Sequence, residues 1–528
     1  MYKIKIYHLF IFVCVAFIGA TACTKKDNGI SPENDHLKFL VLADNPKQTI
    51  QNFGASDAWS IQFVGKNWPE QKRQKIAELL FSNENDDASN PRGIGLSAWR
   101  FNLGAGSAQQ GVASDIQDAW RRAPGMLQND GSYDLEALEG QRNFLRMAQS
   151  YGVDQFIAFV NSPPVQFTKN GKAYSSGGSS TNLKNEHFVD YAVYLKTALE
   201  TIRAEDGIAF NYLSPFNEPQ WNWDHSGQEG CPWRNSEIAS TVRIIDSVFA
   251  STTLPTKVEL SDAGKLTYLY ENDGDATRGS QIEAFFSNNS EWYIGDLEVV
   301  AKKISGHSYY TTYNNKYLLS VRENLRAKVK EFGSDFSFWQ TEYCILEDNE
   351  EIQGPGRDLG IESALYMDRV IHTDLTVANS ETWQWWLAVS PYDYKDGLVY
   401  IDYNKDDGDI YESKILWTLG HYSRFIKQGA KRYDMWRSDN KSVEQSIDGI
   451  YSSSYRNSDG SWVIVITNQS DIDIPVQVGI KDLDDLTFKL YETNADPETN
   501  LDFTLDVSSD ETIEVKGRSI ITLVSDTP

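Results

Sequence analysis

The sequence predicts an α/β protein, a (β/α)8 TIM barrel followed by a smaller β-sandwich. Eight short apolar runs, each as long as a buried strand, recur about 35–60 residues apart with helix-like stretches between them. After residue 420 the runs shorten, alternate apolar with polar residues and are separated by turn sequences, as in an all-β domain. The spacing also fits an open doubly wound sheet, but the chain carries no Gly-rich nucleotide fingerprint, which favours the barrel.

The barrel elements follow from these runs in order. The helix expected to begin near Pro69 has proline at its first turn, where helix starts favour it. The expected helices cover residues 69–81, 135–151, 185–203, 236–250, 317–332 and 360–379. The expected barrel strands cover residues 50–58, 96–103, 155–160, 210–217, 257–262, 303–309, 337–343 and 382–388.

The remaining strands belong to the sandwich. They are expected at 449–455, 461–468, 475–480, 487–491, 512–515 and 519–524. A further strand at 37–43 precedes the barrel and could pair with the sandwich. We therefore expect a joining strand over 38–47, the barrel over 48–418 and the sandwich over 419–528.

The first residues carry a targeting signal. Lys3 and Lys5 precede an apolar run over 9–18, and Ala20-Thr21-Ala22-Cys23 resembles a bacterial lipobox. We expect residues 1–22 to be a lipoprotein signal peptide, Cys23 to be lipidated and residues 23–37 to be a tether. The expected location is the outer membrane or cell surface, otherwise the periplasm or the medium. Membrane contact is expected only through the lipid anchor.

Composition narrows the class of partner. The 528 residues carry a net charge of −26, which opposes a nucleic-acid role. The 15 tryptophans suit core packing, and they also suit stacking against the apolar faces of sugar rings. A polysaccharide or oligosaccharide is the expected partner, and the chain is expected to act as a monomer.

Two glutamates stand at predicted strand ends. Glu218 closes the run Ser214-Pro215-Phe216-Asn217-Glu218-Pro219, and Glu342 closes Phe338-Trp339-Gln340-Thr341-Glu342. In an α/β barrel the carboxyl ends of the strands form the catalytic face. One isolated Glu-Pro is more often a capped turn. The pair in matching contexts instead indicates the two carboxylates of a glycoside hydrolase.

These residues resemble glycoside hydrolase family 30. The resemblance spans roughly residues 38–525, and inside the family the segment from Ser214 to Cys231 is similar to the bacterial endo-β-1,6-galactanase branch. Pro164 stands where some relatives carry a subsite tryptophan, which puts that subsite wall in doubt. The further matching blocks are Ile50–Asp57, Trp99–Gly104, Asn161–Pro164, Gly306–Tyr309 and Leu419–Ile426. The resemblance implies the barrel with its side sandwich and retention of anomeric configuration.

The resemblance also implies roles for individual residues. Glu218 matches the acid/base and Glu342 the nucleophile, with carboxyl groups about 5–5.5 Å apart. Further matches are expected to position these groups or bind the sugar. They are Arg100, which would hold Glu342, Asn217 for the 2-hydroxyl, His307 and Tyr309 beside the carboxylates, and Asp57, Trp59 and Trp386 in the −1 subsite. Arg100 could equally form a structural ion pair, and His307 could be a structural histidine.

Two cysteines remain after Cys14 leaves with the signal peptide and Cys23 is acylated. Cys231 and Cys344 follow the two catalytic candidates, so we expect both on the catalytic face and joined by a disulfide. No cofactor or metal is expected. The acidic stretch 402–409 resembles a calcium loop, but its glycine falls one place late, so a solvated turn is the better interpretation.

The expected function is therefore a retaining, endo-acting hydrolase of β-1,6-galactan side chains of arabinogalactan, which uses two glutamates. Asp57 and Trp59 are the expected discriminators of galactose's axial 4-hydroxyl. The alternatives are a β-1,6-glucanase, a glucuronoxylanase, an exo-β-glycosidase, or a surface lipoprotein that binds glycan without cleaving it.

Overall fold

The computed structural model describes residues 36–509 and 511–526; the predicted signal peptide, Cys23 and all but the last two residues of the predicted tether lie outside them. Eight parallel strands form a closed barrel, because β9 pairs with both β8 and β2. The predicted (β/α)8 barrel is confirmed. Its strands are β2 (Asn52–Ser56), β3 (Ala98–Asn102), β4 (Gln155–Phe159), β5 (Tyr212–Ser214), β6 (Lys257–Ala263), β7 (Val300–His307), β8 (Ser337–Glu342) and β9 (Thr382–Ser390).

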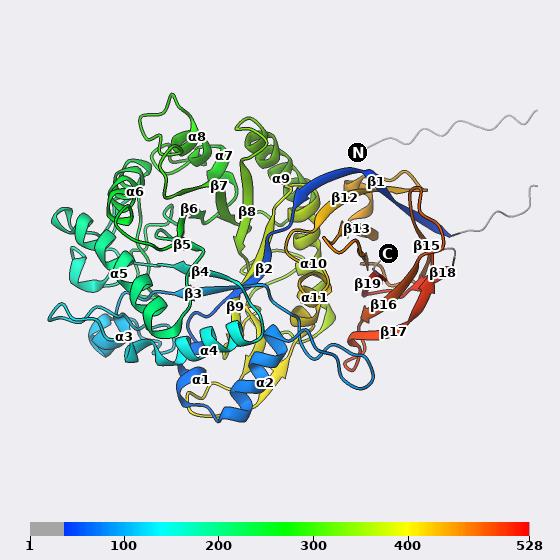
Figure 1. The fold of residues 1–528 in the computed structure, drawn as a ribbon, viewed down its shortest axis with the longest axis horizontal. Helices are drawn as coiled ribbons and strands as arrows, with labels where there is room; N and C mark the ends of the chain where they lie inside the picture. The colour runs from blue at the N-terminus through cyan, green and yellow to red at the C-terminus, as the bar shows by residue number, and fades with distance from the viewer. Residues whose placement is uncertain (1–35, 510, 527–528) are drawn as a thin grey trace, which may run out of the picture. The chain divides into compact units, whose positions relative to one another are not determined.

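Helices surround this barrel, which lies at the left of Figure 1. The N-terminus of α9 is capped by the side chain of Asn314, which accepts a hydrogen bond from the Tyr317 amide. Helices α1 and α4 pack closely, since a Cβ on Gly65 would lie 2.1 Å from the Gly140 carbonyl oxygen. The helices around the barrel are α1 (Ile61–Asn67), α2 (Glu70–Phe81), α3 (Ser107–Gln110), α4 (Glu139–Ser150), α5 (Phe188–Asp206), α6 (Asn235–Phe249), α7 (Thr267–Tyr270), α8 (Gln281–Phe286), α9 (Asn315–Lys330) and α10 (Ile361–Thr376).

The second domain is the predicted β-sandwich, at the right of Figure 1. Its nine strands follow the hydrogen-bonded order β17-β16-β19-β14-β13-β12-β1-β15-β18. They enclose a separate apolar core that includes Trp462, Ile464 and Val476. The strands are β1 (Leu37–Thr49), β12 (Lys431–Arg437), β13 (Ile450–Arg456), β14 (Trp462–Asn468), β15 (Ile474–Ile480), β16 (Thr487–Thr493), β17 (Asn500–Ser508), β18 (Thr512–Val515) and β19 (Ser519–Ser525); a short helix, α12 (Val443–Ser446), precedes β13.

Strand β1 joins the two ends of the described chain. It runs antiparallel to β12, with Leu40 opposite Trp436, and parallel to β15, with Phe39 opposite Val478. The sandwich therefore takes one of its inner strands from the segment that precedes the barrel.

Buried polar contacts attach the sandwich to the barrel. Asp368 of α10 accepts hydrogen bonds from Tyr422, Tyr451 and Thr467 at 2.7–2.8 Å. Helix α11 (Lys414–Ser423) lies between the domains, and all ten of its residues are buried. The interface is buried and hydrogen-bonded, so the two domains form one packed unit.

Four strands had not been predicted from the sequence. They are β10 (Gly397–Ile401), β11 (Ile410–Glu412), β12 and β17. Strands β10 and β11 extend the barrel sheet beyond β9. Within the described ranges, no helix combines the length and apolarity needed to cross a membrane.

Candidate active site

The two glutamates predicted as catalytic come together at the carboxyl end of the barrel. Glu218 lies in the turn after β5, and Glu342 is the last residue of β8. The imidazole of His307, at the end of β7, lies between them. Its Nδ1 is 2.9 Å from Oε1 of Glu218 and 3.5 Å from Oε1 of Glu342. One carboxylate oxygen of each glutamate and a His307 nitrogen all lie within 4.8 Å of one another.

Glu342 is held on both of its oxygens. Arg100 Nη1 donates to Oε2 at 2.8 Å, and the Tyr309 hydroxyl donates to Oε1 at 3.0 Å. Only 3 % of the Glu342 surface is exposed. These two hydrogen bonds fix the orientation of the Glu342 carboxyl group.

Arg100 also contacts a third buried carboxylate. Its Nη2 donates to Oδ2 of Asp262 at 3.2 Å, and both side chains are fully buried. The Arg100 guanidinium packs 4.4 Å from the centre of the Phe159 ring. Arg100 therefore bridges Asp262, at the end of β6, to Glu342, at the end of β8.

Burial and neighbouring charges shift the pKa values of Glu218 and His307. Burial raises the pKa of Glu218; the neighbouring His307 opposes this, and the charges of Glu342 and Asp262 reinforce it. Burial disfavours the His307 imidazolium, but the charge of Glu342 and hydrogen bonds with Asp262 and Glu218 raise the pKa of His307 to about 10. Burial thus favours the protonated form of Glu218, and the surrounding carboxylates favour the imidazolium form of His307.

The cluster of Glu218, His307 and Glu342 has the spacing of a metal site. An imidazolium, however, has both ring nitrogens protonated and offers no lone pair to a metal. In its imidazolium form His307 can donate hydrogen bonds to the carboxylates but cannot act as a metal ligand.

The backbone of Glu218 adopts a left-handed conformation, with φ of 45°. This conformation costs a non-glycine residue about 1–2 kcal/mol. Its amide donates to the Asp262 carbonyl at 2.8 Å, and its carbonyl accepts from the Trp221 amide at 3.2 Å. These bonds aim the Glu218 side chain at His307.

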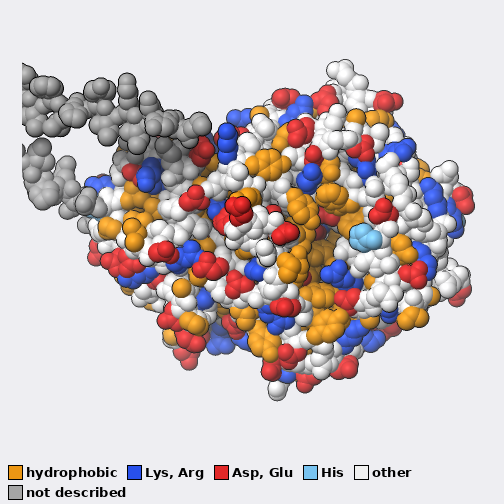
Figure 2. Space-filling view, turned by 180° about the vertical axis from the view of Figure 1, so that it is seen from behind, with side chains coloured by type: hydrophobic (Ala, Val, Ile, Leu, Met, Phe, Trp, Pro, Cys, Tyr) orange, Lys and Arg blue, Asp and Glu red, His pale blue; other side chains and the backbone are white. Residues whose placement is uncertain are grey.

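The carboxylates open into a cavity of about 860 Å³. On the face shown in Figure 2, hydrophobic side chains gather around a hollow. Trp59 and Trp386 meet edge to face in the cavity wall, with ring centres 5.3 Å apart. Oδ1 of Asn217 is buried and accepts no hydrogen bond from the described residues, so it is left for a ligand. The lining consists of Trp59, Arg121, Asn217, Glu218, Trp221, Asn222, Trp223, Asp224, His225, Gln228, Lys265, Tyr309, Tyr310, Glu342, Cys344, Leu346, Trp386, Tyr394 and Asp396.

Comparison with known proteins decides the family. Residues 37–400 match O-Glycosyl hydrolase family 30, and residues 429–523 match the glycosyl hydrolase family 30 beta sandwich domain. This chain belongs to glycoside hydrolase family 30.

Several known proteins are similar to this chain in sequence or in fold. A curated endo-beta-1,6-galactanase of Hypocrea rufa is 23 % identical over 397 residues, which cover 72 % of this chain and 73 % of the relative. The crystal structure of a conserved exported protein from Bacteroides fragilis is 31 % identical, has a TM-score of 0.86 and covers 92 % of this chain and 99 % of its own. The catalytic domain of xylanase C from Talaromyces cellulolyticus is 18 % identical with a TM-score of 0.67, covering 93 % of this chain and 100 % of its own.

One residue that family resemblance placed in the −1 subsite lies elsewhere. Asp57 is fully buried and does not line the cavity. Its Oδ1 accepts from the Asn102 amide at 2.7 Å and its Oδ2 from Gln141 at 3.0 Å. Burial raises the pKa of Asp57 to about 7 against these hydrogen bonds. The prediction that Asp57 contacts the sugar is therefore wrong, because its side chain points into the barrel packing; Trp59, two residues on, does line the cavity.

The predicted disulfide between Cys231 and Cys344 is also wrong. Both thiols are free and buried. Cys231 Sγ packs 3.3 Å from Thr181 Oγ1 and from the Asn182 amide, whereas Cys344 Sγ lies 3.8 Å from the Tyr309 hydroxyl in the cavity wall. The two loops start at the same face of the barrel but direct their sulfur atoms to different partners.

The tryptophans near the site divide into two groups. Trp221 and Trp223, in the loop after Glu218, line the cavity. Trp233 packs in the core against Phe216, with ring centres 4.9 Å apart. Trp383 and Trp385, on β9, are fully buried core residues.

Carboxylates of the acidic stretch 402–409 are engaged in hydrogen bonds and an ion pair that shape the loop. Asp402 accepts hydrogen bonds from the Asp409 amide at 2.8 Å and from the Tyr411 hydroxyl at 3.0 Å. Asp407 forms an ion pair with Lys72 at 2.7 Å. These contacts use the carboxylates for loop structure, as the solvated-turn interpretation expects.

Sequence reasoning missed some residues of the site. Asp262 is the last residue of the strand predicted over 257–262, so the strand-end argument applied to the two glutamates could have found it. Arg121, Lys265 and Asp396 line the cavity from loops with no recognisable pattern. Only the closed barrel brings these loops to one face.

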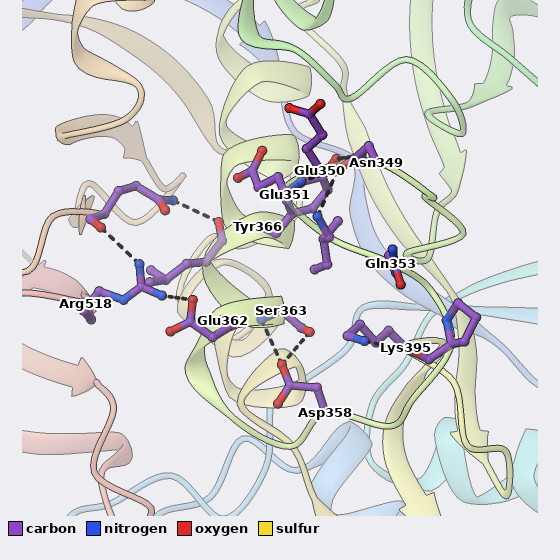
Figure 3. A pocket seen from close by; sticks show the side chains of 14 residues that line it. Asn349, Glu350, Glu351, Gln353, Asp358, Glu362, Ser363, Tyr366, Lys395 and Arg518 are labelled. Carbon is purple, nitrogen blue, oxygen red and sulfur yellow. Dashed lines mark hydrogen bonds and ion pairs between the residues drawn. The ribbon is translucent and has the colours of Figure 1, made fainter.

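A second cavity, of about 450 Å³, is lined by residues of both domains (Figure 3). Its charges are largely used within the protein. Arg518 pairs with Glu362, and Asp358 accepts from the amide and hydroxyl of Ser363 (Figure 3). This cavity contains no tryptophan and neither catalytic candidate, whereas the cavity at the barrel strand ends is lined by tryptophans and by both glutamates.

Proposed function

We propose that this family 30 chain is a retaining, endo-acting hydrolase of β-1,6-linked galactan. The observation that carries the proposal is the pair Glu218 and Glu342, with an oxygen of each within 4.8 Å of the other. Retaining glycosidases place their two carboxyl groups about 5–5.5 Å apart, and inverting enzymes about 6.5–9.5 Å. The short separation leaves no room for the water that an inverting enzyme holds between sugar and base.

In the first step Glu342 attacks the anomeric carbon and the bond from that carbon to the leaving oxygen breaks. Glu218 gives its proton to this oxygen, so the leaving sugar departs as an alcohol. Arg100 and Tyr309 hold Glu342 against rotation, which keeps the attacking oxygen close to the carbon. The product is a glycosyl ester on Glu342.

In the second step Glu218, now ionised, accepts a proton from water. The water oxygen bonds to the anomeric carbon and the ester to Glu342 breaks, which restores both groups. Two inversions at one carbon give net retention. Asn217 lines the same cavity with its Oδ1 unpaired, and we assign it the hydrogen bond from the sugar 2-hydroxyl.

The substrate assignment rests on similarity and on the chemistry of the cavity. The Hypocrea rufa relative is an endo-beta-1,6-galactanase, and the segment from Ser214 to Cys231 resembles that branch. Aromatic side chains suit the apolar faces of sugar rings. With Asp57 excluded, Trp59 remains as the expected discriminator of the axial 4-hydroxyl.

Export also belongs to the proposal. The similar Bacteroides fragilis protein is described as exported, and the N-terminal pattern over residues 1–23 fits a lipoprotein signal. We place the enzyme at the outer membrane or cell surface as a monomer anchored through Cys23. Radiolabelled palmitate should label the wild-type chain and not Cys23→Ser, and labelling of both or neither would contradict the anchor.

The test of function is hydrolysis of debranched β-1,6-galactan, β-1,6-glucan and glucuronoxylan, with Glu342→Gln as the inactive control. We expect galactan to be cleaved fastest, early products to form a ladder of oligosaccharides, and NMR to show the β-anomer first. Faster cleavage of glucan or xylan would show that galactan is not the preferred substrate. Monosaccharide alone from the outset would overturn endo action. Binding of galactan without any hydrolysis would support the alternative function, a lipoprotein that binds glycan without cleaving it.

A further inference from the structure

Asp262 connects the two catalytic candidates by a second route, beside their direct contacts with His307. Its carbonyl accepts the Glu218 amide at 2.8 Å. Its side chain accepts hydrogen bonds from Arg100 at 3.2 Å, from Thr341 at 2.6 Å and from Ser214. No other described aspartate makes this set of contacts.

These contacts reach three other barrel strands. Ser214 ends β5, ahead of the turn that carries Glu218. Thr341 directly precedes Glu342 on β8, and Arg100 on β3 donates to Glu342 itself. A shift of Asp262 would therefore be transmitted to both carboxylates, by backbone on one side and by side chains on the other.

The backbone of Asp262 adds to this connection. Asp262 has φ of 47° and Glu218 has φ of 45°, so two left-handed residues are joined by one amide-to-carbonyl hydrogen bond. Left-handed non-glycine residues persist where the surroundings hold them, and they cluster at functional sites. The Asp262 carboxylate is fully buried. Its hydrogen bonds with Arg100, Thr341 and Ser214 stabilise the left-handed backbone conformation of Asp262.

Charge balance gives Asp262 a second role. Burial opposes ionisation of Asp262, but Arg100 and His307 outweigh it and lower its pKa, so it carries a negative charge. In the resting state that the retaining mechanism requires, the cations Arg100 and His307 balance Asp262 and the nucleophilic carboxylate of Glu342, while Glu218 carries its proton. In the glycosyl-enzyme Glu342 is a neutral ester and Glu218 carries the charge instead, so the balance is unchanged.

We propose that Asp262 is a positioning residue that aligns Glu218 with Glu342 and keeps the buried cluster neutral through both chemical steps. The proposal rests on the retaining mechanism proposed above. Asp262 does not line the cavity and touches no substrate. The ionisable groups that face it are Arg100 from β3, His307 from β7, Glu342 from β8 and Glu218 after β5; deeper in the barrel, Glu259 of its own strand pairs with Lys303 at 2.7 Å.

The test is Asp262→Asn, which keeps the shape and removes the charge. The matched control is Asp374→Asn, because Asp374 is also fully buried and also accepts from an arginine, Arg322, and a serine, Ser308, without contact to Glu218 or Glu342. We expect Asp262→Asn to lower kcat about 10- to 100-fold, because misplacement of reacting groups by about 1 Å costs that much. KM should change little.

The pH profile separates positioning from mere stability. Loss of a negative charge beside Glu218 and His307 lowers the pKa of each, so the alkaline limb of the Asp262→Asn profile should move toward acid. Asp374→Asn should lose thermal stability and retain the wild-type profile. If the Asp262→Asn profile matches the wild type and its kcat loss equals that of Asp374→Asn, the role is structural and the proposal is wrong.

Two further measurements cover the remaining outcomes. NMR titration of the His307 imidazole needs no substrate, so it tests charge balance even if the hydrolytic function is wrong; its midpoint, about 10 in the wild type, should fall in Asp262→Asn. An unchanged midpoint would overturn the proposal. If Asp262→Asn does not fold, Thr341→Val removes only the 2.6 Å hydrogen bond and should lower kcat with KM retained. A wild-type kcat for that variant would equally overturn it.

Discussion

The indole Nε1 of Trp223 donates a hydrogen bond to the backbone carbonyl of Glu218 at 3.1 Å. The ring is fixed from its other side by Gly230, where an added Cβ would lie 2.2 Å from the indole. Trp223 also lines the sugar cavity. One side chain thus joins the cavity wall to the backbone of Glu218, the proposed general acid.

Trp223→Phe keeps an aromatic face and removes this hydrogen bond. A neutral hydrogen bond contributes about 1 kcal/mol, so kcat/KM should fall about 5-fold. Steady-state kinetics on galactan oligosaccharides would measure the change. Trp221→Phe is the control, because no described residue accepts a hydrogen bond from its indole nitrogen, and it should lose less. Equal losses for the two variants would show that the aromatic surface alone matters.

Glu218→Gln and Glu342→Gln should each abolish hydrolysis of polymer while the fold is retained. Loss of the general acid should cost about 10²–10⁴-fold. Glu218→Gln should keep more activity toward an aryl glycoside whose leaving group needs no proton, and Glu342→Gln should not. The control is Glu381→Gln, since Glu381 precedes β9 at the opposite end of the barrel and accepts from Trp339 at 3.1 Å. Substantial polymer hydrolysis by either catalytic variant would refute the assignment.

Glu229 should make stability depend on pH. Burial raises its pKa from 4.5 to about 7, against hydrogen bonds from Ser107 and the Ala105 amide. The folded state therefore binds a proton that the unfolded chain has released, and stability due to this group is present below about pH 4.5 and lost as pH rises to about 7.

Glu229→Gln, which cannot ionise, should remove that dependence. Relative to wild type, the variant should gain about 3 kcal/mol between pH 4.5 and 7. Chemical denaturation at several pH values would measure the difference. A stability difference that stays constant across this window would show that Glu229 is ionised in the fold.

The two cysteines should titrate as thiols. Burial raises the pKa of Cys231 to about 12, so a thiol reagent should not label the native protein. Denaturation without reductant, in a chain carrying Cys14→Ser and Cys23→Ser, should expose two thiols. Mass spectrometry that finds none would restore the disulfide, and a reductant-sensitive melting temperature would support that reversal.

Much of the fold was predictable because barrel strands are apolar on both faces. All nine residues of β9 are buried, and their sequence is continuously apolar apart from three polar positions. Strand β12 was missed because Lys431, Arg432 and Asp434 interrupt its pattern, and its pairing with β1 joins residues nearly 400 positions apart. Strand β17 was missed because most of its side chains are partly or fully exposed.

The site divides in the same way. Glu218 and Glu342 could be found because a strand end on a parallel barrel has a known location. The contacts of Asp57, Cys231 and Cys344 could not be predicted in this way. They depend on the direction of side chains within loops and turns. Asp57 lies one residue beyond β2 and points into the packing, and the two thiols point to unrelated neighbours.

The place of β1 between β12 and β15 limits how this gene could be divided. A fragment that holds only residues 429–523 would lack an inner strand and expose two unpaired sheet edges, which invite aggregation. During synthesis β1 is made before the other strands. Its pairing partners β12 and β15 lie in roughly the last hundred residues, so β1 stays unpaired until these are made. The C-terminal domain therefore cannot be transferred to another protein by itself. A fusion that contains this domain must also contain residues 37–49.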